Sequence, residues 1–341
     1  MNNTHCLITL ESLKNANAPQ PGYSTQGLKA LVGNKKVQMQ LPFTRQQFVV
    51  ELPQRQQGLS MSGYQPKLSL AINQNQFCVV DTFGTYILKP SPEAYPNLAE
   101  NEHAVMTVMK RLGFDIPPFG LVRFKTTEPD AAEELAFIIK RFDRVQGHKH
   151  HQEQLDGAMA AKDKYGNVDG EQAVSYEQAG RFLIDTVDSS LAFKKDLFLR
   201  IVYAYLLANN DLHLRNFAIL VPETAKNTLA PIYDYISTVP YPAVFQSGYL
   251  ALPLLITEEN DGELAKGFDS AYGQYIGYDF IELAKGFGLN EKLVTKMISQ
   301  VVLKASLVVD TLRESHMPHE QSQAVIECFK HRLGALQVFE L

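Results

Sequence analysis

The sequence predicts a bilobal α+β protein, with a small sheet-rich first part and a larger helical second part. Short apolar runs between polar turns follow residue 68, one amphipathic helix comes after them, and long helical patterns fill the second half. The 341 residues are enough for two lobes with separate cores, and 45% of them are hydrophobic. The predicted segments are a lead-in at 1–57, a first lobe at 58–146 and a second lobe at 147–341.

The first part is predicted to fold as an antiparallel sheet with one long helix. Thr44 and Gln47 have capping-box spacing, Gly84 marks a turn between two apolar runs, and Val105 and Met109 lie on one helical face. The expected elements are a helix at 45–52, strands at 68–72, 77–81 and 86–89, a helix at 98–112, and strands at 120–124 and 135–139.

The second part is predicted to be mainly helical after a polar stretch that runs from Arg144 to about Gly170. Helices are expected at 175–183, 195–207, 280–286, 291–312 and 321–333. Between the second and third of these, a strand at 217–221, a turn at 222–227 and a second strand form a hairpin. The junction near 141–147 is then a hinge between the lobes.

Composition excludes several classes of protein. The net charge of −5 comes without a basic block that would follow a nucleic-acid backbone, so direct DNA binding is not expected. Cys6, Cys78 and Cys328 are odd in number and far apart, which indicates neither a disulfide framework nor a zinc site and fits a reducing cytoplasm. The longest apolar run, 249–256, is too short to span a bilayer, so no membrane role is expected.

The most informative segment is 209–216, followed by 231–234. Asp211 is followed five residues later by Asn216, and Asp234 comes after the hairpin, which is the order that ATP-dependent phosphoryl transfer uses. Asp211 can accept the proton of a hydroxyl, while Asn216 and Asp234 can hold Mg²⁺ on triphosphate oxygens. An ordinary polar helix cap at Asp211 and an ordinary strand end at Asp234 are the alternative interpretations.

Lys89 ends a predicted strand, where a kinase keeps the lysine that pairs with nucleotide phosphates. A lysine at a strand end is also often just solvated. Glu102 lies on the apolar side of the following helix, where an unpaired carboxylate would be costly to bury. A Lys89–Glu102 ion pair would remove that cost, and a tilt of the helix would do so as well.

Two further segments lie in the sequence where a kinase has its phosphate-covering loop and its hinge. The Ser/Gly stretch 58–67 precedes the first strand, as a phosphate-covering loop would, and Ser60 and Ser62 could themselves be phosphorylated, although such a stretch is often only a turn. Phe142 could flank an adenine at the hinge, or its neighbours could form a solvated charge cluster. His148, His150 and His151 are attributed to a polar loop rather than a metal site.

These motifs together resemble the HipA family of bacterial serine/threonine kinase toxins. The residues that carry the resemblance are Ser60-x-Ser62-Gly63-x-Gln65-x-Lys67, Ile87-Leu88-Lys89-Pro90, Asn101-Glu102, Arg141-Phe142-Asp143-Arg144, Asn210-Asp211-x-His213-x-x-Asn216-Phe217 and Tyr233-Asp234. The resemblance extends from about residue 58 to the C-terminus. It implies a protein-kinase-like fold that uses ATP and Mg²⁺.

The resemblance also implies roles for individual residues. Asp211 is the catalytic base, Asn216 and Asp234 hold the metal, and Ser60 or Ser62 is autophosphorylated, after which activity falls. The residues that contact ATP are Ser62, Gly63, Tyr64, Gln65, Pro66, Lys67, Lys89, Lys140, Arg141, Phe142, His213, Leu214, Arg215, Asn216, Tyr233 and Asp234.

The resemblance further implies a toxin that phosphorylates an aminoacyl-tRNA synthetase and halts translation, a mode of action linked to persistence. Its antitoxin is a helix-turn-helix protein like HipB, which contacts DNA in its place. Because only about 58 residues precede the loop, the chain is similar to the short HipT subgroup, in which a separate HipS-like protein supplies the missing subdomain. That subgroup favours the tryptophanyl enzyme, and longer members act on the glutamyl enzyme.

Two other functions stay open on the sequence. A small-molecule kinase of the aminoglycoside or choline type has the same bilobal plan. A catalytically silent ATP-binding partner of an antitoxin would belong to a different class, although Asp211 and Asp234 argue against a dead site.

Overall fold

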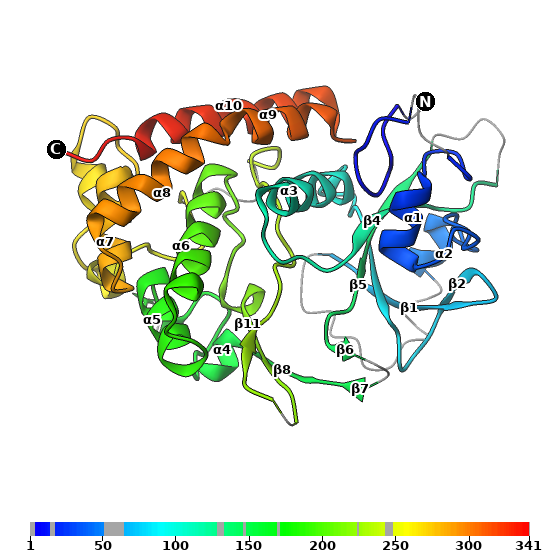
Figure 1. Ribbon diagram of the computed structural model, residues 1–341, viewed down its shortest axis with the longest axis horizontal. Helices are drawn as coiled ribbons and strands as arrows, with labels where there is room; N and C mark the ends of the chain where they lie inside the picture. The colour runs from blue at the N-terminus through cyan, green and yellow to red at the C-terminus, as the bar shows by residue number, and fades with distance from the viewer. Residues whose placement is uncertain are drawn as a thin grey trace. The chain divides into compact units, whose positions relative to one another are not determined.

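The computed structural model describes residues 4–13, 18–50, 65–127, 133–145, 148–168, 171–223, 225–242 and 248–340. The chain forms two compact units, and many of their elements are labelled in Figure 1. The first unit contains Met1–Lys110, Ile116–Arg144 and Thr311–His319, and the second contains Arg111–Asp115, Val145–Asp310 and Glu320–Leu341. A short stretch near the C-terminus thus completes the unit that the N-terminal half builds.

The first unit contains a five-stranded antiparallel sheet of order β2-β1-β3-β5-β4. Its strands are β1 (Leu68–Asn73), β2 (Gln76–Val79), β3 (Tyr86–Pro90), β4 (Phe119–Arg123) and β5 (Leu135–Lys140). The predicted meander and the two later strands are confirmed, with small differences at their ends. The hairpin β1–β2 turns at Gln74 and Asn75, which both have positive φ, a conformation that Asn tolerates well.

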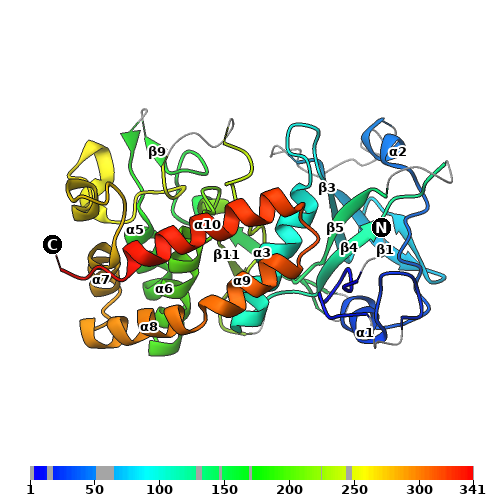
Figure 2. The ribbon, with the colours of Figure 1, turned by 90° about the horizontal axis from the view of Figure 1, so that it is seen from above.

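Three helices accompany this sheet. They are α1 (Thr25–Val32), α2 (Arg45–Val50) and α3 (Leu98–Leu112), and α3 lies beside the sheet in Figures 1 and 2. The helix α1 was not predicted. Its N-cap is Ser24, whose hydroxyl accepts a hydrogen bond from Gly27 N at 3.0 Å. Tyr86 of β3 donates its hydroxyl to Leu31 O at 3.2 Å, so the N-terminal segment is built into the core of this unit.

Glu100 in the first turn of α3 makes the stability of the protein depend on pH. Burial raises the pKa of Glu100 from 4.5 to about 7, against weaker lowering effects that include a hydrogen bond with Ser91. Since the folded state then binds this proton more tightly than the unfolded state, stability falls as pH rises from about 4.5 to 7. The loss of stability from this group is at most about 3 to 4 kcal/mol.

Glu100→Gln is therefore expected to flatten this part of the stability profile and to raise the unfolding midpoint at pH 8. Urea unfolding at pH 5 and pH 8 measures the effect. Glu93→Gln, a matched change at an exposed position, should leave the profile unchanged. An equal slope in wild type and Glu100→Gln would contradict the prediction.

The second unit is mainly helical. Its principal helices are α4 (Leu155–Ala158), α5 (Tyr176–Thr186), α6 (Leu191–Leu206), α7 (Gly277–Gly286), α8 (Glu291–Leu303), α9 (Ala305–Glu314, which ends in the first unit) and α10 (His319–Leu336). Figure 2 shows α10 running across α6, and Arg332 of α10 donates to Tyr205 O at 2.6 Å. Among the described residues, none of the helices has both the length and the apolar character needed to cross a bilayer.

Short strands border the helices. They are β6 (Arg144–Val145), β7 (His148–Lys149), β8 (His151–Gln154), β9 (Asn167–Val168), β10 (Glu171–Gln172), β11 (Ala218–Val221) and β12 (Thr228–Leu229). The hairpin β11–β12 was predicted, whereas β8 was not, because its four residues are all polar and show no apolar alternation. β8 owes its conformation to antiparallel pairing with β11, in the register Gln154↔Ala218 to His151↔Val221.

The single helix predicted at 291–312 is wrong, because the structure breaks it into α8 and α9 at Lys304. The apolar spacing continues through the break, so the pattern alone gives no sign of it. Lys304 donates its Nζ to Leu112 O at 3.3 Å, a main-chain carbonyl at the end of α3. This bond satisfies a carbonyl that the helix itself leaves unpaired.

Candidate functional site

The loop that carries Asp211 follows α6, and a residue with a left-handed backbone conformation lies between the two. Ala208 has φ 52°, and Asn209 N donates to Ala204 O at 2.8 Å, which closes the helix in the manner of a C-terminal cap. Thr238 donates both its main-chain N and its hydroxyl to Ala208 O, each at 2.9 Å. The direction in which the chain leaves α6 is therefore fixed by contacts on both sides.

Asp211 and Asn216 are joined through the main chain of the loop. The amide of Asn216 donates to Asp211 O at 2.7 Å, and residues Leu214–Asn216 form a turn of 3-10 helix. Tyr176 of α5 donates its hydroxyl to Leu212 O at 2.6 Å, so the buried middle of the loop is also held. Because the NH₂ group of Asn216 donates to this carbonyl, the amide oxygen of Asn216 points away from it.

Asp234 lies in a conformation that few residues adopt. Its φ is 54°, which Asp tolerates better than most side chains, and such outliers are frequent at functional positions. The preceding Tyr233 donates its hydroxyl to Arg215 O at 2.9 Å, next to Asn216 in the sequence. Together with the bonds of Thr238, this contact ties the segment around Asp234 to the loop of Asp211 at two points.

Charged groups surround His213 in this loop. Burial and then the positive charge of Lys164 lower the pKa of His213 to about 4, against the opposing effect of Asp234. The imidazole is therefore neutral at pH 7. Asp211 Oδ1 lies 3.6 Å from Lys164 Nζ and 3.7 Å from His213 Nε2. Asp211 and Asp234, the two aspartates predicted from the sequence, thus both lie close enough to His213 to interact with it electrostatically.

The residues around Asp234 fit a nucleotide-bound Mg²⁺. Asp234 offers carboxylate oxygens and Asn216 an amide oxygen, which are the hard donors that this cation prefers. In the described part of the chain, no three His, Cys, Asp or Glu side chains gather into a metal cage. Mg²⁺ on a triphosphate needs only one or two protein ligands, since phosphate oxygens and water supply the rest.

Two other residues of this loop, predicted to contact ATP, have different surroundings. Arg215 pairs through Nε with Asp156 Oδ2 of α4 at 2.6 Å, and the side chains are 38% and 13% exposed, so the pair is partly open to solvent. Leu214 is fully buried, and its main-chain N donates to Lys164 O at 2.9 Å. The side chain of Leu214 therefore belongs to the core of the second unit.

The first unit holds Lys89 and Glu102 as a buried ion pair. Lys89 Nζ lies 2.6 Å from Glu102 Oε1, and the side chains are 3% and 1% exposed. Nζ also lies 5.4 Å from the centre of the Phe137 ring on the neighbouring strand. Glu102 is thus paired in the structure, and a role of Lys89 with nucleotide phosphates remains a prediction.

The other predicted ATP contacts of the first unit lie around the ends of β3 and β5. Gln65 donates its side chain to Pro90 O at 2.9 Å, while Lys140 is exposed at the end of β5. Burial would raise the pKa of Asp143, but hydrogen bonds and charge from Arg141 and Arg144 lower it, so Asp143 holds the two arginines as a carboxylate. Pro66, Lys67 and Phe142 are half-buried, whereas Ser60, Ser62, Gly63 and Tyr64 lie outside the described residues.

Lys164, a cation beside Asp211, was not predicted from the sequence. It belongs to the polar stretch that precedes α5, 47 residues before Asp211 in the sequence. The signal that was present is Asp163-Lys164-Tyr165-Gly166-Asn167, a run of turn-forming residues around one Lys and one Tyr. Only the structure brings this turn to the loop of Asp211.

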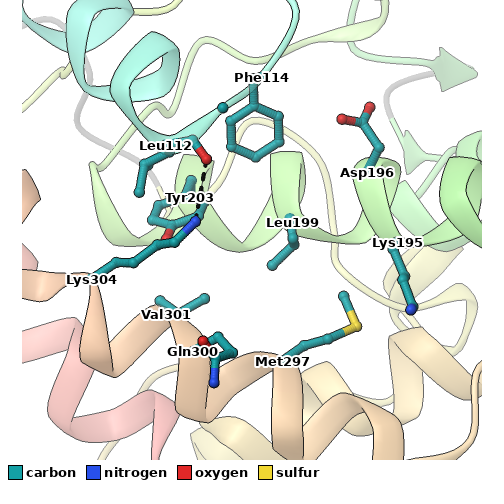
Figure 3. A pocket seen from close by; sticks show the side chains of 11 residues that line it. Leu112, Phe114, Lys195, Asp196, Leu199, Tyr203, Met297, Gln300, Val301 and Lys304 are labelled. Atoms are coloured by element: carbon teal, nitrogen blue, oxygen red, sulfur yellow. Dashed lines mark hydrogen bonds between the residues drawn. The ribbon is translucent and has the colours of Figure 1, made fainter.

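A separate pocket of about 290 Å³ lies in the second unit (Figure 3). Its walls come from the end of α3, from α6 and from α8, and include Phe114, Tyr203 and Val301. None of the predicted site residues lines it. Lys304 crosses one side of this pocket to reach Leu112 O, as the dashed line in Figure 3 marks.

Comparisons with known proteins identify the family of the chain. The family model described as HipA-like C-terminal domain matches residues 59–308. The "Putative kinase" of Haemophilus influenzae is 48% identical over 337 residues, which cover 98% of this chain and 97% of that protein. The serine/threonine-protein kinase toxin HipA of Shewanella oneidensis is 23% identical over 80% of this chain and 64% of the toxin.

A solved structure shows the same fold. The chain matches HipA of Shewanella oneidensis, determined in complex with HipB and operator DNA, with a TM-score of 0.58 and 19% identity. The match covers 82% of this chain and 64% of the HipA chain. The protein therefore spans about two thirds of that toxin and nearly all of the Haemophilus kinase. The extent of the family match and the identity to the Haemophilus protein show that this chain belongs to the HipA family of kinases.

Proposed function

We propose that this kinase is the toxin of a toxin–antitoxin pair and that it phosphorylates serine or threonine of a protein with ATP. The observation that carries the proposal is that the segments of Asp211, Asn216 and Asp234 are connected within one unit. The side chains of Asn216, Tyr233 and Thr238 donate hydrogen bonds to main-chain carbonyls of the Asp211 loop and of the residues that precede it. The lysine that would pair with phosphates is Lys89, in its ion pair with Glu102.

In the proposed reaction, the oxygen of a substrate hydroxyl attacks the γ-phosphorus of ATP. The new O–P bond forms as the bond to the β-phosphate oxygen breaks, ADP leaves, and Asp211 takes the proton of the hydroxyl. Asn216 and Asp234 would hold Mg²⁺, which neutralises charge on the phosphate oxygens when it is bound. His213, neutral at pH 7, adds no positive charge to this side of the loop.

The protein substrate is proposed to be an aminoacyl-tRNA synthetase, with the tryptophanyl enzyme favoured over the glutamyl enzyme. The partners are proposed to be a helix-turn-helix antitoxin like HipB, which would contact DNA, and a small HipS-like protein. The complex of the Shewanella toxin with HipB and operator DNA supports the first of these. Autophosphorylation of Ser60 or Ser62 is proposed to lower activity, because a phosphoserine adds about −1.5 to −2 charges beside a triphosphate.

The experiment that tests the proposal is mass spectrometry of phosphatase-treated protein after incubation with Mg-ATP, alone and with each purified synthetase. Wild type is expected to add phosphate to its own 60–67 peptide and to the tryptophanyl enzyme, and Asp211→Asn to neither. An Asp211→Asn protein with full transfer would overturn the mechanism. Phosphate on choline or aminoglycosides but on no protein would indicate a small-molecule kinase, and no transfer at all a silent ATP-binding partner.

A further inference from the structure

Lys164 places a positive charge beside the carboxylate of Asp211. Its Nζ lies 3.6 Å from Asp211 Oδ1, and the two side chains are 22% and 25% exposed. Both are therefore partly shielded from water but still reachable by a substrate. At this distance and burial, an ammonium and a carboxylate attract each other more strongly than an exposed surface pair does.

The turn that presents Lys164 is tightly built. Asp163 Oδ1 accepts hydrogen bonds from Tyr165 N at 2.8 Å and from Asn167 N at 3.0 Å, while the Asn167 amide donates to Oδ2 at 3.0 Å. Gly166 follows with φ 72°, and a Cβ there would come within 2.5 Å of Val174. Glycine is thus required at this position both by its backbone conformation and by its neighbour.

The same turn is attached directly to the loop of Asp211. Leu214 N donates to Lys164 O at 2.9 Å, and the rings of Tyr165 and His213 meet edge to face with their centres 5.7 Å apart. Lys164 Nζ lies 4.7 Å from the centre of the Tyr165 ring, so this ring limits where the ammonium can go. The position of the Lys164 ammonium is therefore set by the main-chain bond to Leu214, by the Tyr165 ring and by Asp211.

We propose that Lys164 is a positioning residue for phosphoryl transfer, which holds one oxygen of Asp211 so that the other faces the substrate hydroxyl. This inference rests on the proposed role of Asp211 as the base. A carboxylate that is free to rotate would face the hydroxyl only part of the time, and small errors in placing a catalytic group can reduce a rate by about 10²-fold. Loss of the Lys164 charge should therefore lower kcat, with little change in KM for ATP.

A purely structural role for Lys164 makes a different prediction. The bond from Leu214 N uses the main-chain carbonyl of Lys164, which a side-chain substitution leaves in place. Lys164→Gln should consequently keep the turn and the unfolding midpoint while it removes the charge. Lys164→Arg keeps the positive charge. If this charge orients the Asp211 carboxylate, Lys164→Arg should retain most of the wild-type rate. A structural role would instead reduce stability in both variants and leave the rate per folded molecule unchanged.

The test measures kcat and KM for ATP of Mg-ATP-dependent autophosphorylation in wild type, Lys164→Gln, Lys164→Met, Lys164→Arg and Asp211→Asn. Lys149→Gln is the matched control, since Lys149 is exposed on β7. We expect kcat to fall by about 10 to 100-fold in the two neutral variants, to recover to within about fivefold in Lys164→Arg, and to stay unchanged in Lys149→Gln.

The outcomes separate this inference from the proposed function. Unchanged kcat in Lys164→Gln and Lys164→Met, with Asp211→Asn inactive, would overturn the role of Lys164 and leave the base assignment intact. A raised KM with unchanged kcat would also overturn it, because the side chain would then serve ATP binding. Full activity of Asp211→Asn would overturn the base assignment and this inference with it. If Lys164→Gln fails to fold, Lys164→Met and Lys164→Arg supply the same comparison.

Discussion

Asp234→Asn should lower the rate of phosphate transfer by roughly 10³-fold, the size of effect seen when a single electrostatic group is removed from a catalytic site. The substitution keeps the shape of the side chain but removes the negative charge that would hold Mg²⁺. Asn accepts a left-handed backbone about as readily as Asp, so the φ of 54° should persist and the protein should fold. The rate of autophosphorylation at increasing Mg²⁺ measures the effect, and residual activity should need more Mg²⁺ than wild type.

Asp261→Asn provides a close control for this experiment. Asp261 belongs to the same unit, also has a left-handed φ, of 56°, and is exposed. Its replacement changes the same charge in the same backbone conformation, so it should alter the rate by less than about twofold if distant charges are screened. A loss smaller than tenfold in Asp234→Asn, with an unchanged Mg²⁺ requirement, would show that Asp234 is not the metal ligand.

Breaking the Lys89–Glu102 pair should destabilise the protein by about 3 to 5 kcal/mol, because a buried charge then loses the opposite charge at 2.6 Å. Glu102→Gln removes the carboxylate of the pair, and Lys89→Met removes its ammonium. The double variant Lys89→Met/Glu102→Leu removes both charges and should recover most of the loss. Urea unfolding of the three variants measures these differences.

Activity separates the structural and catalytic roles of this pair. If Lys89 also binds nucleotide phosphates, the double variant should be stable but inactive. The exposed pair Lys285–Glu282, with its atoms at 2.8 Å, is the control, and Glu282→Gln should cost less than about 1 kcal/mol. A cost as small as this in Glu102→Gln would contradict a buried pair, and an active double variant would argue against a nucleotide role of Lys89.

The sheet of the first unit was predictable because the residues of each strand themselves show the apolar pattern of a strand. β1, β3 and β5 are short apolar segments between polar turns, and α3 has apolar residues on one face before Gly113. β8 is the opposite case, since His151–Gln154 becomes a strand only by pairing with β11, a partner more than sixty residues away. The break between α8 and α9 was missed for a related reason, because the apolar pattern continues through Lys304.

Some residues of the candidate site could likewise be predicted from the sequence, and others could not. Asp211, Asn216 and Asp234 could be chosen from order and spacing, because the chemistry of phosphoryl transfer needs those residue types in that sequence. Lys164 could not, since nothing in a polar turn indicates which loop it will meet in space. The roles of all these residues, the three segment boundaries and the autophosphorylation of Ser60 or Ser62 stay predictions, and both serines lie outside the described residues.

Residues Thr311–His319 belong to the first unit, although residues of the second unit separate them in the sequence from the rest of the first. Leu312 is fully buried there, and His316 Nε2 lies 3.4 Å from Cys6 O, which is near the opposite end of the chain. During translation, residues 1–144 therefore leave the ribosome before the segment 311–319, so this unit can complete its contacts only after residue 319 has been made. A nascent chain interrupted before residue 311 would lack this segment and could not form the contacts of Leu312 and His316 in the first unit.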